Sequence, residues 1–132
     1  MTFHLVLVTR YRNKVMNQAM LARCGQILGA TLGRWRCEML SFGGEADHVH
    51  VVFRAHPALN PSSLVNNLKT VTSRLLRKEF SDEIARFYWK PVFWSGAYYL
   101  GTTGKYDLNA VRRYVESQEV KIPAPDPTLA CA

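Results

Sequence analysis

Residues 3–9, with the sequence FHLVLVT, constrain the fold most, because they are apolar on both of the faces that alternate along a strand. A strand with one face in solvent alternates apolar and polar side chains, whereas a strand covered on both sides of its sheet reads as an apolar run. We therefore expect this segment to lie in a sheet that has another layer packed on each face.

Helical and strand patterns follow one another along the rest of the chain. Apolar residues recur at helical spacing over residues 18–34, after Asn17 as a cap, and again over residues 61–80, where Asn60 and Pro61 provide the start signals. Strands are predicted at residues 36–44, 48–55 and 94–104. Asp107 caps a last predicted helix over residues 108–120.

The order of these elements is strand, helix, strand, strand, helix, strand, followed by an extra helix. This order predicts an α+β fold of the ferredoxin-like type, in which the strands form an antiparallel sheet. We assign residues 1–122 to one domain and residues 123–132 to a loose Pro-rich tail. The fold alone implies no function.

The charge of the chain favours a polyanionic partner. Seventeen Lys and Arg against ten Asp and Glu give a formal net charge of +7, so nucleic acid is the first partner to consider. No apolar run approaches the roughly 20 residues that span a bilayer, and no signal peptide is recognisable. Three cysteines without close pairing argue against a disulfide framework, which favours the cytoplasm.

The motif DHVH at residues 47–50 places His48 and His50 on the same face of a predicted strand, while Val49 points to the other face. Two imidazoles can bind a divalent ion, but a useful site needs at least a third ligand. Taken alone, the short HxH pattern is more typical of two partly exposed strand residues than of a metal site.

The last predicted helix offers a phenol and an amide one turn apart. Leu108, Val111, Val115 and Ile122 form an apolar stripe that suits the second sheet face, and Tyr114 and Gln118 lie along its edge. Either residue alone is typical of ordinary packing. With His48 and His50 they form a coherent set of two nitrogens, an amide oxygen and a phenol.

Four segments together resemble the small single-tyrosine HUH transposases, of the TnpA type, from bacterial and archaeal insertion sequences. The segments are DHVHVVF, SSLVNNLKTVTSRLLRKEF, FWSGAYYLGTTG and VRRYVESQ, and the resemblance runs from about Phe3 to Gln118. It implies that His48, His50 and Gln118 bind the metal, Mg²⁺ or Mn²⁺, and that Tyr114 is the catalytic nucleophile. The residue types alone would also suit cobalt, nickel or zinc.

The resemblance also implies a reaction and partners. The tyrosine attacks single-stranded DNA at the ends of the element, leaves a 5′-phosphotyrosine link and a free 3′-hydroxyl, and a second hydroxyl then rejoins the DNA. The family recognises DNA hairpins near those ends. It forms homodimers with joined sheets, in which the tyrosine helix of one subunit completes the site of the other. Gly101 and Gly104 could hinge that helix, or serve as ordinary turn residues.

Basic residues in three segments are candidates for binding nucleic acid. For each residue taken singly, a solvated surface charge is the favoured interpretation. The candidates are Arg10, Arg12 and Lys14 near the N-terminus, Arg74, Arg77 and Lys78 on the second helix, and Arg112 and Arg113 beside Tyr114. The aromatic residues Phe87, Tyr88, Trp89, Phe93 and Trp94 could stack on bases, although packing is the better interpretation for most of them.

Two other functions remain compatible with the fold. One is a binding module that recognises structured nucleic acid without cutting it, such as an inactive or domesticated relative. The other is a different HUH nuclease, such as a replication initiator or a plasmid relaxase. The full set of His48, His50, Tyr114 and Gln118 disfavours the first, and the short chain that ends in a YxxxQ helix disfavours the second.

Overall fold

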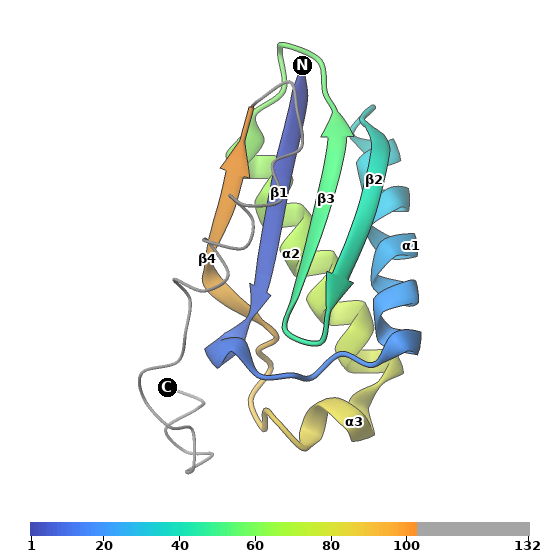
Figure 1. Cartoon of the computed structure of the whole chain (residues 1–132), viewed down its shortest axis with the longest axis vertical. Coiled ribbons are helices and arrows are strands. Elements are labelled where there is room, and N and C mark those ends of the chain that lie inside the picture. The colour runs from blue at the N-terminus through green and yellow to red at the C-terminus, as the bar shows by residue number, and fades with distance from the viewer. Residues whose placement is uncertain (103–132) are drawn as a thin grey trace.

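The computed structural model describes residues 1–102, which form a four-stranded antiparallel sheet with helices on one side (Figure 1). The sheet contains β1 (Thr2–Thr9), β2 (Glu38–Glu45), β3 (His48–Arg54) and β4 (Trp94–Gly101), in the spatial order β2-β3-β1-β4. All the strand pairs are antiparallel. This order and direction confirm the predicted ferredoxin-like fold.

The two long helices begin where their caps predict. In α1 (Gln18–Arg34) the Asn17 side chain accepts a hydrogen bond from the Met20 backbone N–H at 2.8 Å. In α2 (Pro61–Glu79) Asn60 accepts one from Ser63 at 3.2 Å, and Pro61 occupies the first turn. Each cap satisfies a backbone donor that the helix itself leaves unpaired.

The main core lies between the helices and one face of the sheet. Leu5 and Leu7 of β1 and Val49, Val51 and Phe53 of β3 are buried there with the apolar stripes of α1 and α2. On the other face, Val6 and Val8 are also buried and Tyr99 packs against them. Every residue of β1 from Phe3 to Thr9 is buried, as the apolar run predicted.

The buried face of α2 differs in part from the apolar stripe that helical spacing predicts, which consists of Leu64, Leu68, Val71, Leu75 and Leu76. Val71 and Leu75 are only partly buried, whereas Val65 and Thr72 are buried fully. Thr72 tolerates burial because its hydroxyl donates to the Leu68 carbonyl at 2.7 Å and accepts from Trp94 Nε1 at 2.8 Å. A pattern based only on apolar residues at helical spacing does not predict a buried polar residue such as Thr72.

Three local features also depart from the predicted pattern. β2 begins at Glu38 rather than residue 36, because Arg36 has a φ of 59° and the Cys37 N–H closes a turn on the Leu32 carbonyl. A short 3₁₀ turn, η1 (Arg10–Arg12), follows β1. The segment between residues 80 and 94, for which the sequence predicts no helix or strand, contains α3 (Ser81–Ala85), which buries Ile84. The predicted last helix and the tail lie outside the described residues.

Candidate metal and nucleic-acid site

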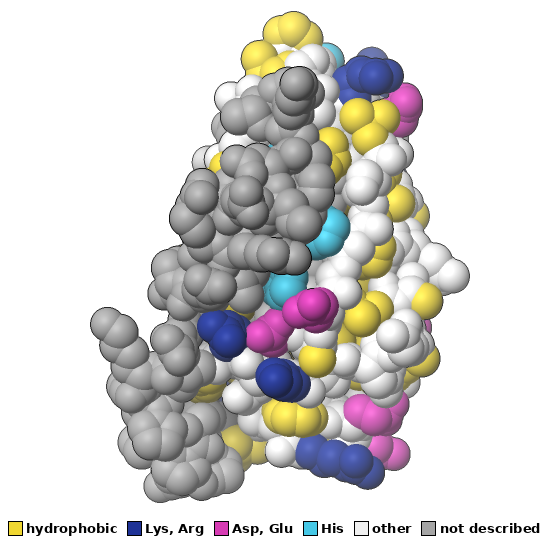
Figure 2. All heavy atoms as spheres, in the orientation of Figure 1, with side chains coloured by type: hydrophobic (Ala, Val, Ile, Leu, Met, Phe, Trp, Pro, Cys, Tyr) yellow, Lys and Arg dark blue, Asp and Glu magenta, His cyan; other side chains and the backbone are white. Residues whose placement is uncertain are grey.

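His48 and His50 lie side by side on the face of β3 that is turned away from the helices. Their cross-strand partners are Val8 and Val6 on β1, and Glu45 and Gly43 on β2. The two ring centroids are 6.4 Å apart and the ring planes are inclined by 30°. Figure 2 shows histidine side chains at this surface, close to acidic and basic side chains. The structure therefore brings the two imidazoles together as the HxH spacing predicted.

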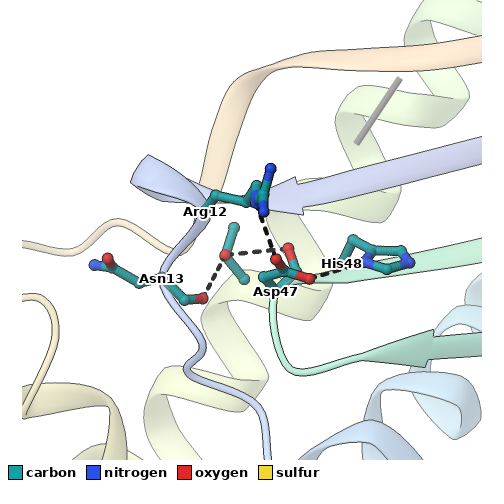
Figure 3. A network of polar contacts seen from close by, with 5 residues as sticks. Arg12, Asn13, Asp47 and His48 are labelled. Carbon is teal, nitrogen blue, oxygen red and sulfur yellow. Dashed lines mark hydrogen bonds and ion pairs between the residues drawn. The ribbon is translucent and has the colours of Figure 1, made fainter. Parts of the chain in front are cut away.

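Asp47 holds His48 in one orientation (Figure 3). Its Oδ1 lies 2.9 Å from His48 Nδ1, and its Oδ2 accepts a hydrogen bond from Arg12 Nε at 3.1 Å. An ionised carboxylate can only accept, so Nδ1 carries the proton and the lone pair lies on Nε2. The Asp47 backbone carbonyl also accepts hydrogen bonds from the Thr9 N–H and hydroxyl. Such an outer carboxylate is typical of metal-binding histidines.

Gly43 provides the space that the His50 ring occupies. A Cβ at this position would lie 2.9 Å from both Cε1 and Nε2 of His50, closer than real Cβ contacts come. Burial of the ring, together with repulsion from His48, lowers the pKa of His50, while Glu45 acts in the opposite direction. Both effects that lower the pKa favour the neutral imidazole, which is the form that binds a metal ion.

The hairpin between β2 and β3 brings a further potential ligand, the Glu45 carboxylate, next to the Asp47–His48 pair. Ala46 and Asp47 form its two-residue loop, which sets Glu45 directly opposite His48. Ligand atoms of Glu45, Asp47 and His48 all lie within 4.8 Å of one another. Carboxylate oxygens suit Mg²⁺ and Mn²⁺. The HxH spacing does not predict Glu45 or Asp47 as part of the site, although a tight hairpin that joins two strands places both beside His48.

The basic candidates within the described residues fall into different surroundings. Arg12 forms an ion pair with Asp47, and Arg77 Nε donates a hydrogen bond to Ser73 Oγ at 3.1 Å. Lys14, Arg74 and Lys78 are exposed. Arg74 also lines a groove between α1 and α2 together with Arg23 and Arg34. Arg10 lines a separate pocket at the base of β4.

The aromatic candidates divide between core and surface. Tyr88, Phe93 and Trp94 are buried in the main core, as the packing interpretation predicted. Phe87 and Trp89 are 37% and 55% exposed.

Within residues 1–102, no helix is long and apolar enough to cross a membrane.

A family comparison decides the class of protein. Residues 1–118 match the family model described as "Transposase IS200 like". This chain belongs to the IS200-like transposase family. The transposases for insertion sequence element IS200 of Salmonella typhimurium LT2 and Salmonella typhi are each 28% identical to it over 117 residues, which is 88% of this chain and 75% of each relative.

Solved structures of transposases share the fold. A protein assigned as a transposase from Deinococcus radiodurans R1 superposes with a TM-score of 0.82 at 22% identity, covering 91% of this chain and 92% of its own. A REP-associated tyrosine transposase bound to a REP hairpin gives a TM-score of 0.58 at 10% identity, covering 87% of this chain and 62% of its own.

Half of the predicted catalytic set of this IS200-like transposase lies within the described residues. His48 and His50 are there, and they share one face of the sheet. Tyr114, Gln118, Arg112 and Arg113 lie outside the described residues, as does Gly104 of the proposed hinge. Gly101 is the last residue of β4.

Proposed function

We propose that this transposase cleaves and rejoins single-stranded DNA at insertion-sequence ends through a covalent tyrosine intermediate, with Tyr114 as nucleophile and His48, His50 and Gln118 as metal ligands. The observation that carries the proposal is the paired histidines on one face of β3, with His48 oriented by Asp47. A protein that only binds DNA has no need of two adjacent imidazoles, one of them oriented by a buried carboxylate.

The residues present fit a divalent ion. The His48 Nε2 lone pair is free of the Asp47 contact, the glycine at position 43 leaves room for the His50 ring, and Glu45 adds a nearby carboxylate. We propose Mg²⁺ or Mn²⁺ as the ion, with Gln118 completing the set. When bound, such an ion supplies Lewis-acid polarisation of the scissile phosphate.

The chemistry balances without an external energy source. The Tyr114 phenol loses its proton as its oxygen forms a bond to phosphorus, and the bond from phosphorus to the 3′ oxygen breaks, which releases a 3′-hydroxyl. A second 3′-hydroxyl reverses the exchange and displaces the tyrosine. One phosphodiester replaces another, so the step is transesterification rather than hydrolysis.

We also propose that the DNA substrate carries hairpins and that the active transposase is a homodimer. The hairpin in the REP-associated relative supports the first point, because that protein has the same fold. A net charge of +7 supports binding to the phosphate backbone. Homodimerisation with shared sites comes from the family resemblance.

The test is formation of a covalent adduct. We expect the protein, incubated with single-stranded DNA from the ends of its own element and Mn²⁺, to form an adduct that survives denaturation and runs as a protein–DNA conjugate. Tyr114→Phe should abolish the adduct and keep DNA binding, because it removes only the hydroxyl.

Two controls separate the parts of this proposal. EDTA should prevent the adduct in the wild type, and cleavage that continues in EDTA would exclude the metal role of His48 and His50. An adduct that persists in Tyr114→Phe would show that another residue is the nucleophile. DNA binding without any adduct would favour the non-cleaving alternative.

A further inference from the structure

A small pocket lies where the end of β1, the middle of α2 and the start of β4 meet. Its volume is about 200 Å³. Pockets that enclose a whole small molecule are usually larger, roughly 300–1,000 Å³. This one suits a single chemical group on a larger ligand. Its walls are formed by Arg10, Lys69, Thr70, Ser73, Pro91, Val92, Phe93 and Trp94.

The pocket carries positive charge that no acidic residue among residues 1–102 offsets. Arg10 and Lys69 both line it, and none of the described residues that line it is Asp or Glu. Burial and the neighbouring Arg10 lower the pKa of Lys69, so the two cations are close enough to repel each other. Two adjacent, partly buried cations are unfavourable unless an anion lies between them.

Hydrogen-bond donors are also available in this pocket. Arg10 Nε is buried and has no hydrogen-bond partner among the described residues. Lys69 Nζ donates to the Ser95 carbonyl at 2.8 Å and to the Gly96 carbonyl at 3.4 Å, which fixes its position and leaves one ammonium proton to donate to a ligand. Ser73 Oγ accepts from Arg77 Nε, so its own hydroxyl proton can point elsewhere.

We propose that this pocket binds a backbone phosphate of single-stranded DNA through Arg10, Lys69 and the Ser73 hydroxyl. Two cations and a hydroxyl match the oxygens of a phosphodiester, and the described part of the walls offers no exposed aromatic face that could stack on a base. This inference rests on the proposed function for its ligand and adds Lys69 and Ser73, which the charge pattern of the sequence did not single out.

The position of the pocket suits a substrate that also reaches the histidines. Arg10 directly follows Thr9, and the Thr9 N–H bonds to the Asp47 carbonyl at 3.0 Å. Asp47 in turn holds His48. The phosphate pocket and the histidine pair therefore lie at the same end of β1, but the pocket is walled by α2 and the histidines occupy the other face of the sheet. A DNA strand that passes round this end of the sheet would contact both, and its anchorage in the pocket would lower the entropic cost of positioning the scissile bond.

The first experiment uses inorganic phosphate as the probe and EDTA to remove metal. We expect saturable shifts of the Ser73, Ser95 and Gly96 backbone amides in ¹H–¹⁵N NMR spectra. Lys69→Met should weaken phosphate binding about tenfold and Ser73→Ala about threefold, whereas Lys69→Arg should stay within about threefold of the wild type. Shifts that do not saturate, or that are unchanged in Lys69→Met, would overturn the proposal.

The second experiment distinguishes DNA from free phosphate. Fluorescence anisotropy in EDTA would follow a labelled single strand of roughly 16 nucleotides. Lys69→Met should weaken binding about tenfold and reduce the slope of log affinity against log salt by about 0.7. Arg86→Met removes the same charge from an exposed position outside the pocket and should have little effect. An equal loss in both variants would mean that only net charge matters.

The two proposals fail separately. Neither binding measurement depends on Tyr114 or on a metal ion. If phosphate and DNA bind as expected but no adduct forms with Mn²⁺, only the proposed chemistry is wrong. If the adduct forms equally well in Lys69→Met, and phosphate does not bind, only the pocket is wrong.

Discussion

Asp47 shows how one residue can connect the fold to the candidate chemistry. It is the last loop residue before β3, its side chain is only 8% exposed, and both carboxylate oxygens are occupied. One oxygen orients His48, and the other accepts from Arg12, which has a φ of 55° in η1. The unusual backbone after β1 therefore aims Arg12 at the residue that holds His48.

Asp47→Asn should weaken Mn²⁺ binding about 10- to 100-fold, because an uncharged amide orients the imidazole less firmly. It should also lower the free energy of unfolding by about 1–3 kcal/mol, through loss of hydrogen bonds between charged groups. Titration calorimetry and urea unfolding measure the two effects. Glu38→Gln, in the exposed pair with Arg54, is the control and should leave the Mn²⁺ affinity unchanged. Equal Mn²⁺ affinities for Asp47→Asn and the wild type would refute the orienting role.

Gly43→Ala should disturb the site without unfolding the protein. The added Cβ would meet the His50 ring at 2.9 Å, so the ring must move. We expect Mn²⁺ binding to weaken about tenfold or more, because a displaced imidazole is a poorer ligand. Gly96→Ala is the matched control, since a Cβ there meets nothing within 4 Å. If His50 keeps its NMR shifts and Mn²⁺ affinity in Gly43→Ala, the close approach does not constrain the site.

At the scale of elements, α1 and β2 pack through glycines whose surroundings differ. Gly25 faces the half-buried Phe42 ring, whereas Gly29 faces the end of Met39, which is 36% exposed. An aromatic ring held in the sheet cannot yield as the tip of a flexible methionine can. The helix therefore approaches the strand closely at one glycine and more loosely at the other.

Gly25→Ala should destabilise the protein by about 1–3 kcal/mol, because its Cβ would lie 2.9 Å from the Phe42 ring and force the two elements apart. Gly29→Ala should be neutral or stabilising by up to about 1 kcal/mol, because the helix gains propensity and Met39 can rotate. Urea unfolding of the two variants makes the comparison. The packing argument is wrong if Gly25→Ala is as stable as Gly29→Ala.

At the scale of the whole molecule, the sheet has a different environment on each face. The face toward α1 and α2 buries the main core, and the other face carries His48 and His50 beside the buried Val6 and Val8. A central strand buried on both sides gives the histidines a rigid base, which favours a preorganised site. The proposed homodimer would add the tyrosine of one subunit to the histidines of the other.

This arrangement can be tested by mixing two inactive variants. Tyr114→Phe keeps the histidines, and His50→Ala keeps the tyrosine, so a mixed dimer contains one intact composite site if the sites are shared. After unfolding and refolding together in equal amounts, the mixture should recover about a quarter of the wild-type adduct, because half of the dimers are mixed and each has one intact site. Each variant refolded alone is the control. A mixture as inactive as its parts would place the tyrosine and histidines of each site on one subunit.

The sequence by itself determined the ferredoxin-like order, the helix caps, the double burial of β1 and the shared face of His48 and His50. These follow from local periodicity and from residues a few positions apart. Only the tertiary structure decided that Arg12 meets Asp47, that Thr72 bonds to Trp94, and that Arg10 and Lys69 line one pocket. Those contacts join residues far apart in the chain, and their geometry depends on how the sheet and helices pack.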